Sequence, residues 1–184
     1  MNKLYFVTTN GFKKDEAVKL FCSYPEIAFS VIENHITEIM DFDLKVIVRD
    51  KLLKAYQILG LPCAVEHGAL HIDYLNGLPG GISKVVWDNL DDKICLLLPD
   101  DSLARRATAK SVVGYCDGKK IHMFEGETSG SISSSGRGDR KFQWDPIFIP
   151  DGETQTYAEL DIDRKLQYSQ AMKAWKQLAS FLGK

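Results

Sequence analysis

The sequence lacks the features that mark secreted and membrane proteins. It has only four cysteines, none in a C-x-x-C pair, and no secretory signal precedes the strand-like residues 4–7. No apolar run approaches the roughly 20 residues that a membrane span needs. We therefore expect a cytoplasmic protein with reduced thiols and no membrane partner.

The sequence also lacks an excess of charge of either sign. Its 23 Lys and Arg residues stand against 25 Asp and Glu residues, a formal net charge of -2 at pH 7. A nucleic acid polymer calls for a strongly basic surface, so we expect no such partner. Repeats and linkers between domains are missing too, so we expect one domain over residues 1–184.

The apolar pattern first alternates strands with helices. Strand-like residues 4–7 and Ile27–Ile32 flank a helix from Phe12, and helical spacing predicts a second helix over Leu44–Leu59. The later expected elements are short strands at 63–65 and 70–72 around a tight turn, a helix near Ser83–Leu90, a hairpin turning at Asp117-Gly118, a flexible run over 129–138, a strand at 146–149 and a closing helix over 163–182. This order predicts an α/β protein with a mixed sheet flanked by helices.

The first chemical signal lies where the first strand meets the first helix. Thr9 or Asn10 is a suitable N-cap for this helix. A helix N-terminus presents backbone N–H groups to an anion, and Lys13 on the first turn adds a full positive charge. By itself the segment fits a capped surface helix better than an anion site.

Later motifs follow this corner in a fixed order. They are Glu38 ahead of the Leu44–Leu59 helix, Glu66-His67-Gly68, Asn76-Gly77-Leu78-Pro79-Gly80, Trp144-Asp145-Pro146 and Thr156-Tyr157-Ala158-Glu159. Together with T-x-N-x-x-K-x-x-E at Thr8, Asn10, Lys13 and Glu16, the ordered set resembles the inosine triphosphate pyrophosphatase family from end to end. The resemblance implies an elongated α/β fold with two lobes around a central cleft, a homodimer, and hydrolysis of a nucleoside triphosphate to the monophosphate and pyrophosphate with Mg²⁺.

The resemblance also implies a role for each matching residue. The substrate-binding residues would be Thr8, Asn10, Lys13, Lys51 and Lys84 for the phosphates, and Phe142, Trp144, Asp145, Lys165, Ser169 and Gln170 for the rest of the nucleotide. Glu38, Glu66 and His67 would hold the metal, and Lys13, Glu66 and His67 would carry the catalysis. Carboxylates suit Mg²⁺, and Mn²⁺ is the alternative ion.

The sequence departs from the family at its acidic pair, which reads Glu66-His67 here instead of Glu-Asp or Asp-Asp. In the family the second member binds the metal and activates water. His67 has three interpretations. It is a general base suited to neutral pH, a metal ligand that favours Mn²⁺, Co²⁺ or Zn²⁺ over Mg²⁺, or an inert replacement that leaves Glu38 and Glu66 to hold the metal with hydrolysis greatly weakened.

A second departure replaces the family's Ser-His-Arg triplet by Ser169-Gln170-Ala171. The change removes a cation and a donor from the edge of the base, so discrimination for the six-keto purines should fall. Gln170 carries a donor and an acceptor and could read a different base, such as a pyrimidine or a modified nucleotide. Three functions remain: a pyrophosphatase of altered base preference, a nucleotide-binding homologue without hydrolysis that acts as a sensor or partner subunit, and an enzyme cleaving another phosphoanhydride.

Overall fold

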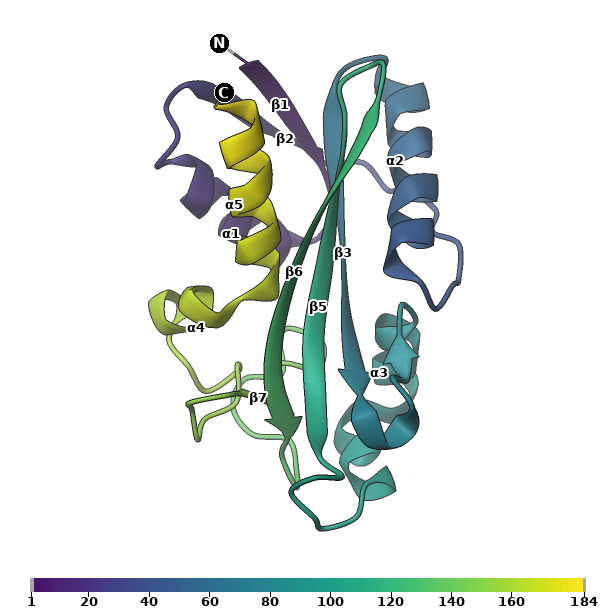
Figure 1. Cartoon of the computed structure of the whole chain (residues 1–184), viewed down its shortest axis with the longest axis vertical. Helices are drawn as coiled ribbons and strands as arrows, with labels where there is room; N and C mark the ends of the chain where they lie inside the picture. Colours follow the sequence, from purple (N-terminus) through teal and green to yellow (C-terminus); the bar gives the residue numbers. More distant parts are fainter. Residues whose placement is uncertain (1, 184) are drawn as a thin grey trace. The chain divides into compact units, whose positions relative to one another are not determined.

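The computed structural model describes residues 2–183 and holds a seven-stranded mixed sheet with helices (Figure 1). The strand order is β2-β1-β3-β5-β6-β7, with the short β4 paired to β3. The elements are β1 Asn2–Val7, α1 Gly11–Phe21, β2 Ile27–Ile32, α2 Leu44–Leu59, β3 Cys63–Ile72, η1 Asp73–Leu75, β4 Pro79–Gly80, α3 Ser83–Leu90, η2 Asp91–Leu97, β5 Arg106–Cys116, β6 Ile121–Ile132, β7 Phe148–Pro150, α4 Ile162–Tyr168 and α5 Gln170–Leu182. The expected α/β class with a mixed sheet is confirmed.

The chain forms two compact units, each made of segments that are distant in sequence. Unit 1 comprises Met1–His67, Ser111–Gly126 and Ala171–Lys184, and unit 2 comprises Gly68–Lys110 and Glu127–Gln170. The long strands β3, β5 and β6 each have residues in both units. The single domain over 1–184 and the central cleft stay predictions.

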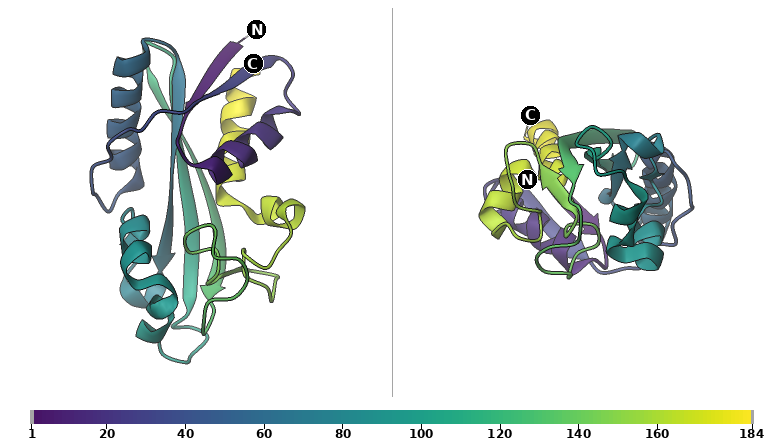
Figure 2. Two further views of the ribbon diagram at one scale, coloured as in Figure 1. Left: turned by 180° about the vertical axis from the view of Figure 1, so that it is seen from behind. Right: turned by 90° about the horizontal axis from the view of Figure 1, so that it is seen from below.

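Aromatic side chains build the core of unit 1 on one face of its sheet. Strand β1 pairs in parallel with β2 and with β3, which places buried Phe6 in the middle of this part of the sheet. Trp175 of α5 meets Phe6 and Phe21 edge-on, at centroid distances of 4.7 and 5.8 Å, and Phe21 stacks on Phe29 at 4.3 Å. These contacts join α1 and α5 on one face of the unit 1 sheet (Figure 2).

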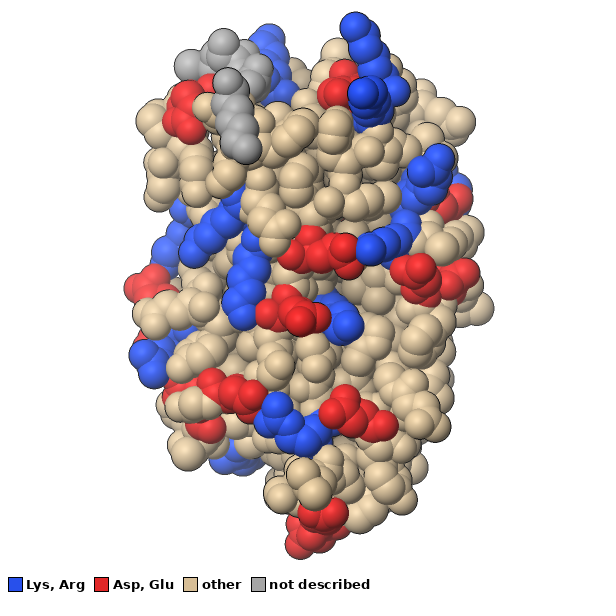
Figure 3. Space-filling model, in the orientation of Figure 1, with Lys and Arg blue, Asp and Glu red and all other residues tan. Residues whose placement is uncertain are grey.

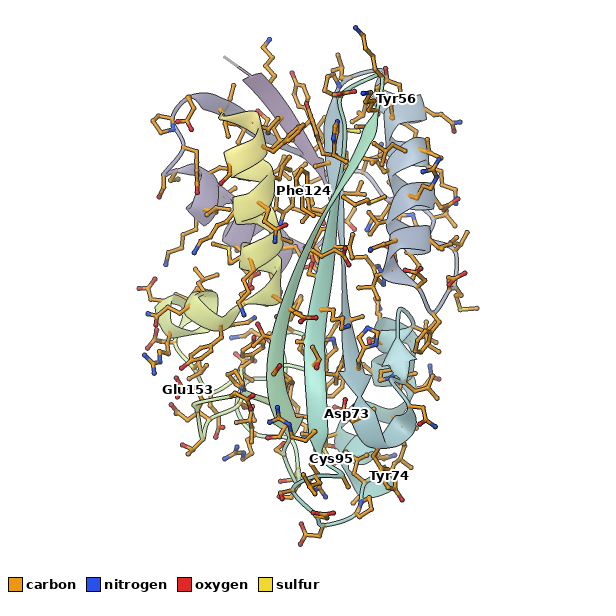
Figure 4. The ribbon with its side chains drawn as sticks, viewed as in Figure 1. Tyr56, Asp73, Tyr74, Cys95, Phe124 and Glu153 are labelled. Atoms are coloured by element: carbon orange, nitrogen blue, oxygen red, sulfur yellow. The ribbon has the colours of Figure 1, made fainter. Side chains whose placement is uncertain are left out.

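Helix α2 covers the other face of the sheet in unit 1, as Figures 1 and 2 show. Its approach depends on Gly114 of β5, where an added Cβ would lie 2.6 Å from Val48 Cγ1. On the α5 side, Phe124 of β6 (labelled in Figure 4) contacts Phe181 at a centroid distance of 5.6 Å. Both faces of the unit 1 sheet are therefore closed by packed helices.

Unit 2 has its own hydrophobic core. Its buried members are Leu70, Ile72, Ile94, Cys95, Leu98, Ala107, Ala109, Ile132, Trp144, Ile147, Phe148 and Tyr157. Trp144 and Tyr157 both contact Phe148, at centroid distances of 5.8 and 5.0 Å. Within residues 2–183 no helix is both long enough and apolar enough to cross a bilayer.

Several expected elements are confirmed and others are wrong. The helices over Leu44–Leu59 and Ser83–Leu90 and the strand Ile27–Ile32 have the bounds expected. The expected turn between strands 63–65 and 70–72 is wrong, because β3 runs unbroken from Cys63 to Ile72. Residues 129–132, expected to be flexible, extend β6, and the expected single helix over 163–182 is two helices that meet at Ser169. The strand expected at 146–149 lies at Phe148–Pro150.

Candidate functional site

The corner between β1 and α1 presents the N-terminal end of a capped helix. Asn10 is the N-cap, in an extended conformation, and its side chain accepts a hydrogen bond of 3.1 Å from the Lys13 backbone N–H. Buried Thr8 in turn accepts from the Asn10 N–H at 3.1 Å. These bonds fix the first turn of α1, so its N-terminal end provides a partial positive charge at a defined place.

Beside this corner, the Glu66 carboxylate receives two donors on one of its oxygens. Lys13 Nζ lies 3.2 Å from Glu66 Oε1, and Ser111 Oγ donates to the same atom at 2.8 Å. Glu66 is only 3% exposed. Its other oxygen, Oε2, is buried and has no hydrogen-bond partner within the described residues. A buried carboxylate oxygen in this state is a strong candidate to bind a cation.

A second pair of opposite charges lies next to the first. Lys51 Nζ donates to Glu38 Oε1 and, at 3.3 Å, to the Glu66 carbonyl oxygen. His67 Nδ1 lies 3.4 Å from Glu38 Oε2. Burial by itself raises the pKa of Glu38, but the His67 contact and the Lys51 charge outweigh burial and hold the pKa below its ordinary value. Burial and the neighbouring Lys13 charge lower the pKa of Lys51. The Glu38 carboxylate raises this pKa and so offsets part of the shift.

The expected metal set is only partly assembled. In the part of the chain that the structure describes, no three His, Cys, Asp or Glu side chains are grouped so as to hold a metal ion. Lysines neutralise both Glu38 and Glu66 instead. The two carboxylates nevertheless suit Mg²⁺, a hard cation that prefers oxygen ligands, and Glu66 Oε2 is available to it. That His67 completes the set stays a prediction.

Unit 2 holds a second group of polar side chains, centred on Lys165. Its Nζ lies 2.6 Å from Asp145 Oδ2, and both side chains are buried. The same ammonium lies over the ring of half-buried Phe142, 4.9 Å from its centroid, and 5.7 Å from that of Tyr157. Burial raises the pKa of Asp145, and Lys165 counters this in part. Asp145 Oδ1 has no hydrogen-bond partner among the described residues.

Gln170 lies where α4 ends and α5 begins. Ser169 ends α4, with its N–H donating to the Lys165 carbonyl at 2.9 Å. The hydroxyl of Tyr157 donates to Gln170 Oε1 at 3.3 Å. This bond occupies one of the two acceptor positions of the buried amide oxygen, and Nε2 carries the donors of the side chain.

The structure brings most of the predicted residues together within one unit or the other. Unit 1 gathers Thr8, Asn10, Lys13, Glu38, Lys51, Glu66 and His67, and unit 2 gathers Phe142, Asp145, Lys165, Ser169 and Gln170. Trp144 belongs to the unit 2 core and is 3% exposed. Lys84 has a side chain 62% exposed and pairs with Asp88 one turn along α3.

Two functional candidates were not predicted from the sequence. Tyr157 lies inside the T-Y-A-E motif, which gave a signal for the segment but not for this side chain. Ser111 lies in no motif. Its role depends on which residue of β5 faces Glu66, which only the folded arrangement of the strands determines.

Comparisons with known proteins give the family and the fold of this chain. A model of the Ham1 family matches residues 4–181. A dITP/XTP pyrophosphatase from Methanopyrus kandleri is 35% identical over 180 residues, covering 97% of this chain and 95% of its own length. An inosine triphosphate pyrophosphatase from Candida glabrata is 36% identical over 188 residues, covering 98% and 97%. A solved HAM1 protein from Coxiella burnetii shares the fold, with a TM-score of 0.82 and 24% identity over 100% of this chain and 99% of its own.

Proposed function

The chain belongs to the Ham1 family, and we infer that it is a nucleoside triphosphate pyrophosphatase. Water would attack the α-phosphorus, the bond from that phosphorus to the oxygen bridging to the β-phosphorus would break, and pyrophosphate would leave. The observation that carries this proposal is the cluster of Lys13, Lys51, Glu38 and Glu66 beside the Asn10-capped helix. Such a cluster supplies cations for a polyphosphate and carboxylates for its metal ion.

Charge balance explains how the unit 1 cluster can accept a substrate. Two lysines face two carboxylates, so its four formal charges cancel. A triphosphate carries about four negative charges and enters with a divalent cation. Lys13 and Lys51 would then turn to the phosphates, and Glu38 and Glu66 would hold the cation in their place. Each buried charge keeps an opposite charge beside it throughout, which avoids the cost of an isolated buried ion.

Mg²⁺ would be held by Glu38 and Glu66. When bound, it would neutralise phosphate charge and increase the acidity of a coordinated water. Lys13 and the N-terminus of α1 would stabilise the negative charge that develops on the pyrophosphate leaving group.

His67 is proposed as the group that takes the proton from the attacking water. Its contact with Glu38 fixes the plane of the imidazole ring, as a carboxylate does for other catalytic histidines. We expect His67→Asn to lower kcat by about 100-fold or more, the usual contribution of a general base. His35→Asn, at an exposed histidine, is the matched control. A kcat within threefold of wild type would mean that His67 takes no proton and is an inert replacement.

Base recognition would rest on unit 2. Phe142 would stack on the base, held in place by Lys165 over its ring, and Gln170 would donate from Nε2 to a keto oxygen. A neutral amide replaces the cation and donor of the family triplet, so the preference among keto-bearing bases should be broad. Adenine and cytosine present an amino group at that edge and should be poor substrates. That one nucleotide engages both groups stays a prediction.

The function can be tested with a panel of inosine, xanthosine, guanosine, uridine, adenosine and cytidine triphosphates and their deoxy forms. Pyrophosphate release would be measured with Mg²⁺ and then with Mn²⁺. We expect turnover of the keto-bearing nucleotides, with monophosphate and pyrophosphate formed in equal amounts. Calorimetric binding of these nucleotides without turnover under either metal would favour the sensor or partner-subunit function instead.

A further inference from the structure

Ser111 is a fully buried hydroxyl beside the proposed metal-binding carboxylate. It lies on β5 with 0% of its surface exposed. Its Oγ is 2.8 Å from Glu66 Oε1 and 3.4 Å from the His67 carbonyl oxygen. One hydroxyl carries one proton, and the shorter contact to a carboxylate is the stronger hydrogen bond. The Ser111 hydroxyl therefore donates its proton to Glu66.

Ser111 and Lys13 both reach Oε1 of Glu66, and neither reaches Oε2. The two donors differ in what a substrate does to them. Lys13 has a flexible four-carbon stem and a full charge, so a polyphosphate at the end of α1 would draw it away from Glu66. Ser111 has one short rotatable bond, no charge and no exposed surface. Its hydrogen bond to Glu66 would therefore persist when substrate and cation bind.

We propose that Ser111 is a positioning residue that fixes Oε1 of Glu66 and thereby presents Oε2 to the divalent cation. The inference rests on the proposed function, in which Glu66 binds that cation. Without Ser111 the carboxylate would lose its last fixed donor once Lys13 has moved, and it could rotate about its terminal torsion. Hydrogen-bond partners of metal-binding groups typically contribute 10- to 100-fold in metal affinity or activity.

The test uses the full-length protein and Ser111→Ala. Mn²⁺ is titrated by calorimetry in the presence of a non-hydrolysable nucleoside triphosphate analogue, and kcat and KM are measured separately at saturating metal. We expect the Kd for Mn²⁺ to rise by about 10-fold or more, with the nucleotide KM changed by less than threefold. A purely structural role would lower the melting temperature and leave the Kd unchanged.

Two further variants keep the outcome interpretable. Ser111→Cys keeps nearly the same volume with a weaker donor, so its Kd should fall between wild type and Ser111→Ala. If the alanine variant does not fold, Ser111→Cys tests the proposal in its place. Ser133→Ala removes another buried serine hydroxyl, one that donates to the Ser135 carbonyl, and should leave the Kd for Mn²⁺ at the wild-type value.

The two proposals fail in different ways. Turnover by wild type together with an unchanged Kd in Ser111→Ala would overturn the role of Ser111 and leave the pyrophosphatase function standing. Absence of turnover would overturn the function, whereas the Mn²⁺ titration would still decide the role of Ser111. A wild-type protein that binds no Mn²⁺ beside the analogue would overturn the inference about Ser111 directly.

Discussion

Two adjacent lysines of α1 lie in different surroundings. Lys13 is largely buried beside Glu66, and its neighbour Lys14 forms an exposed pair with Glu33. We expect Lys13→Gln to lower kcat/KM by about 10- to 100-fold, the loss of one charge-assisted contact to a phosphate. Steady-state pyrophosphate release measures it.

Lys14→Gln is the matched control, since it removes the same charge from the next position of the same helix. It should change kcat/KM by less than twofold, because an exposed ion pair contributes little and faces solvent. Equal losses in both variants would mean that the charge of α1 as a whole, and not a site at Lys13, attracts the nucleotide.

Gln170 allows a test of base preference at one atom. Gln170→Glu keeps the shape of the side chain but exchanges the Nε2 donor for an acceptor oxygen. We expect kcat/KM for keto-bearing nucleotides to fall by about 10- to 100-fold relative to amino-bearing ones, because a keto oxygen would then face a carboxylate. Gln177→Glu, at an exposed position of the same helix, controls for the added charge. An unchanged ratio of the two substrate classes would remove Gln170 from base recognition.

At the scale of elements, the N-terminus of α1 is capped by Asn10 and is proposed to bind phosphate, and substitutions of Asn10 separate these two roles. Asn10→Ala should destabilise the protein by about 1 kcal/mol through loss of the cap. Asn10→Asp caps a helix equally well, so its stability should stay within about 0.5 kcal/mol of wild type. Its carboxylate would repel the triphosphate, and we expect kcat/KM to fall. Urea unfolding and kinetics measure both effects, and an Asn10→Asp enzyme of wild-type activity would place the phosphates elsewhere.

The elements that the sequence predicts well are those whose pattern is local. Helix α2 combines apolar residues at helical spacing with the left-handed Gly60 at its end, and its bounds are correct. The error in β3 comes from polar residues inside a buried strand. Glu66, His67 and Gly68 look like a turn, yet Glu66 and His67 are buried inside a continuous strand. Local rules fail where a fold places polar groups in its interior.

Other features depend on contacts that no local pattern contains. Gly130 looks like part of a flexible run, but it lies in β6 opposite β7, where an added Cβ would stand 2.2 Å from the Ile149 carbonyl oxygen. The break at Ser169 is held by a hydrogen bond from the Thr128 hydroxyl to the Tyr168 carbonyl. The family motifs supplied the candidate site residues, whose roles stay predictions, whereas Ser111 could be found only from the folded strands.

At the scale of the whole molecule, charges are balanced locally. Acidic and basic side chains lie next to one another on the face drawn in Figure 3. Pairing and hydrogen bonding lower the pKa of Glu33, Glu38, Asp92, Asp117, Asp139, Asp151 and Glu153, whereas burial raises that of Asp145. Because most shifted carboxyl groups bind protons more weakly in the folded state, acid should destabilise this protein.

Asp117, at the turn between β5 and β6, defines a pH range over which acid should destabilise the protein. Backbone N–H groups of Lys120 and Lys119, and then His122, lower its pKa from 3.8 to about 2. The unfolded chain therefore binds the proton first as pH falls, and the stability from this carboxylate is present above pH 3.8 and lost on the way down to about 2.

We expect Asp117→Asn to melt at a lower temperature than wild type at pH 6 and to lose less of its melting temperature between pH 4 and pH 2.5. Asp15→Asn removes the same charge from the exposed surface of α1 and controls for net charge. Parallel melting curves for Asp117→Asn and wild type over this range would show that the turn does not contribute to acid sensitivity.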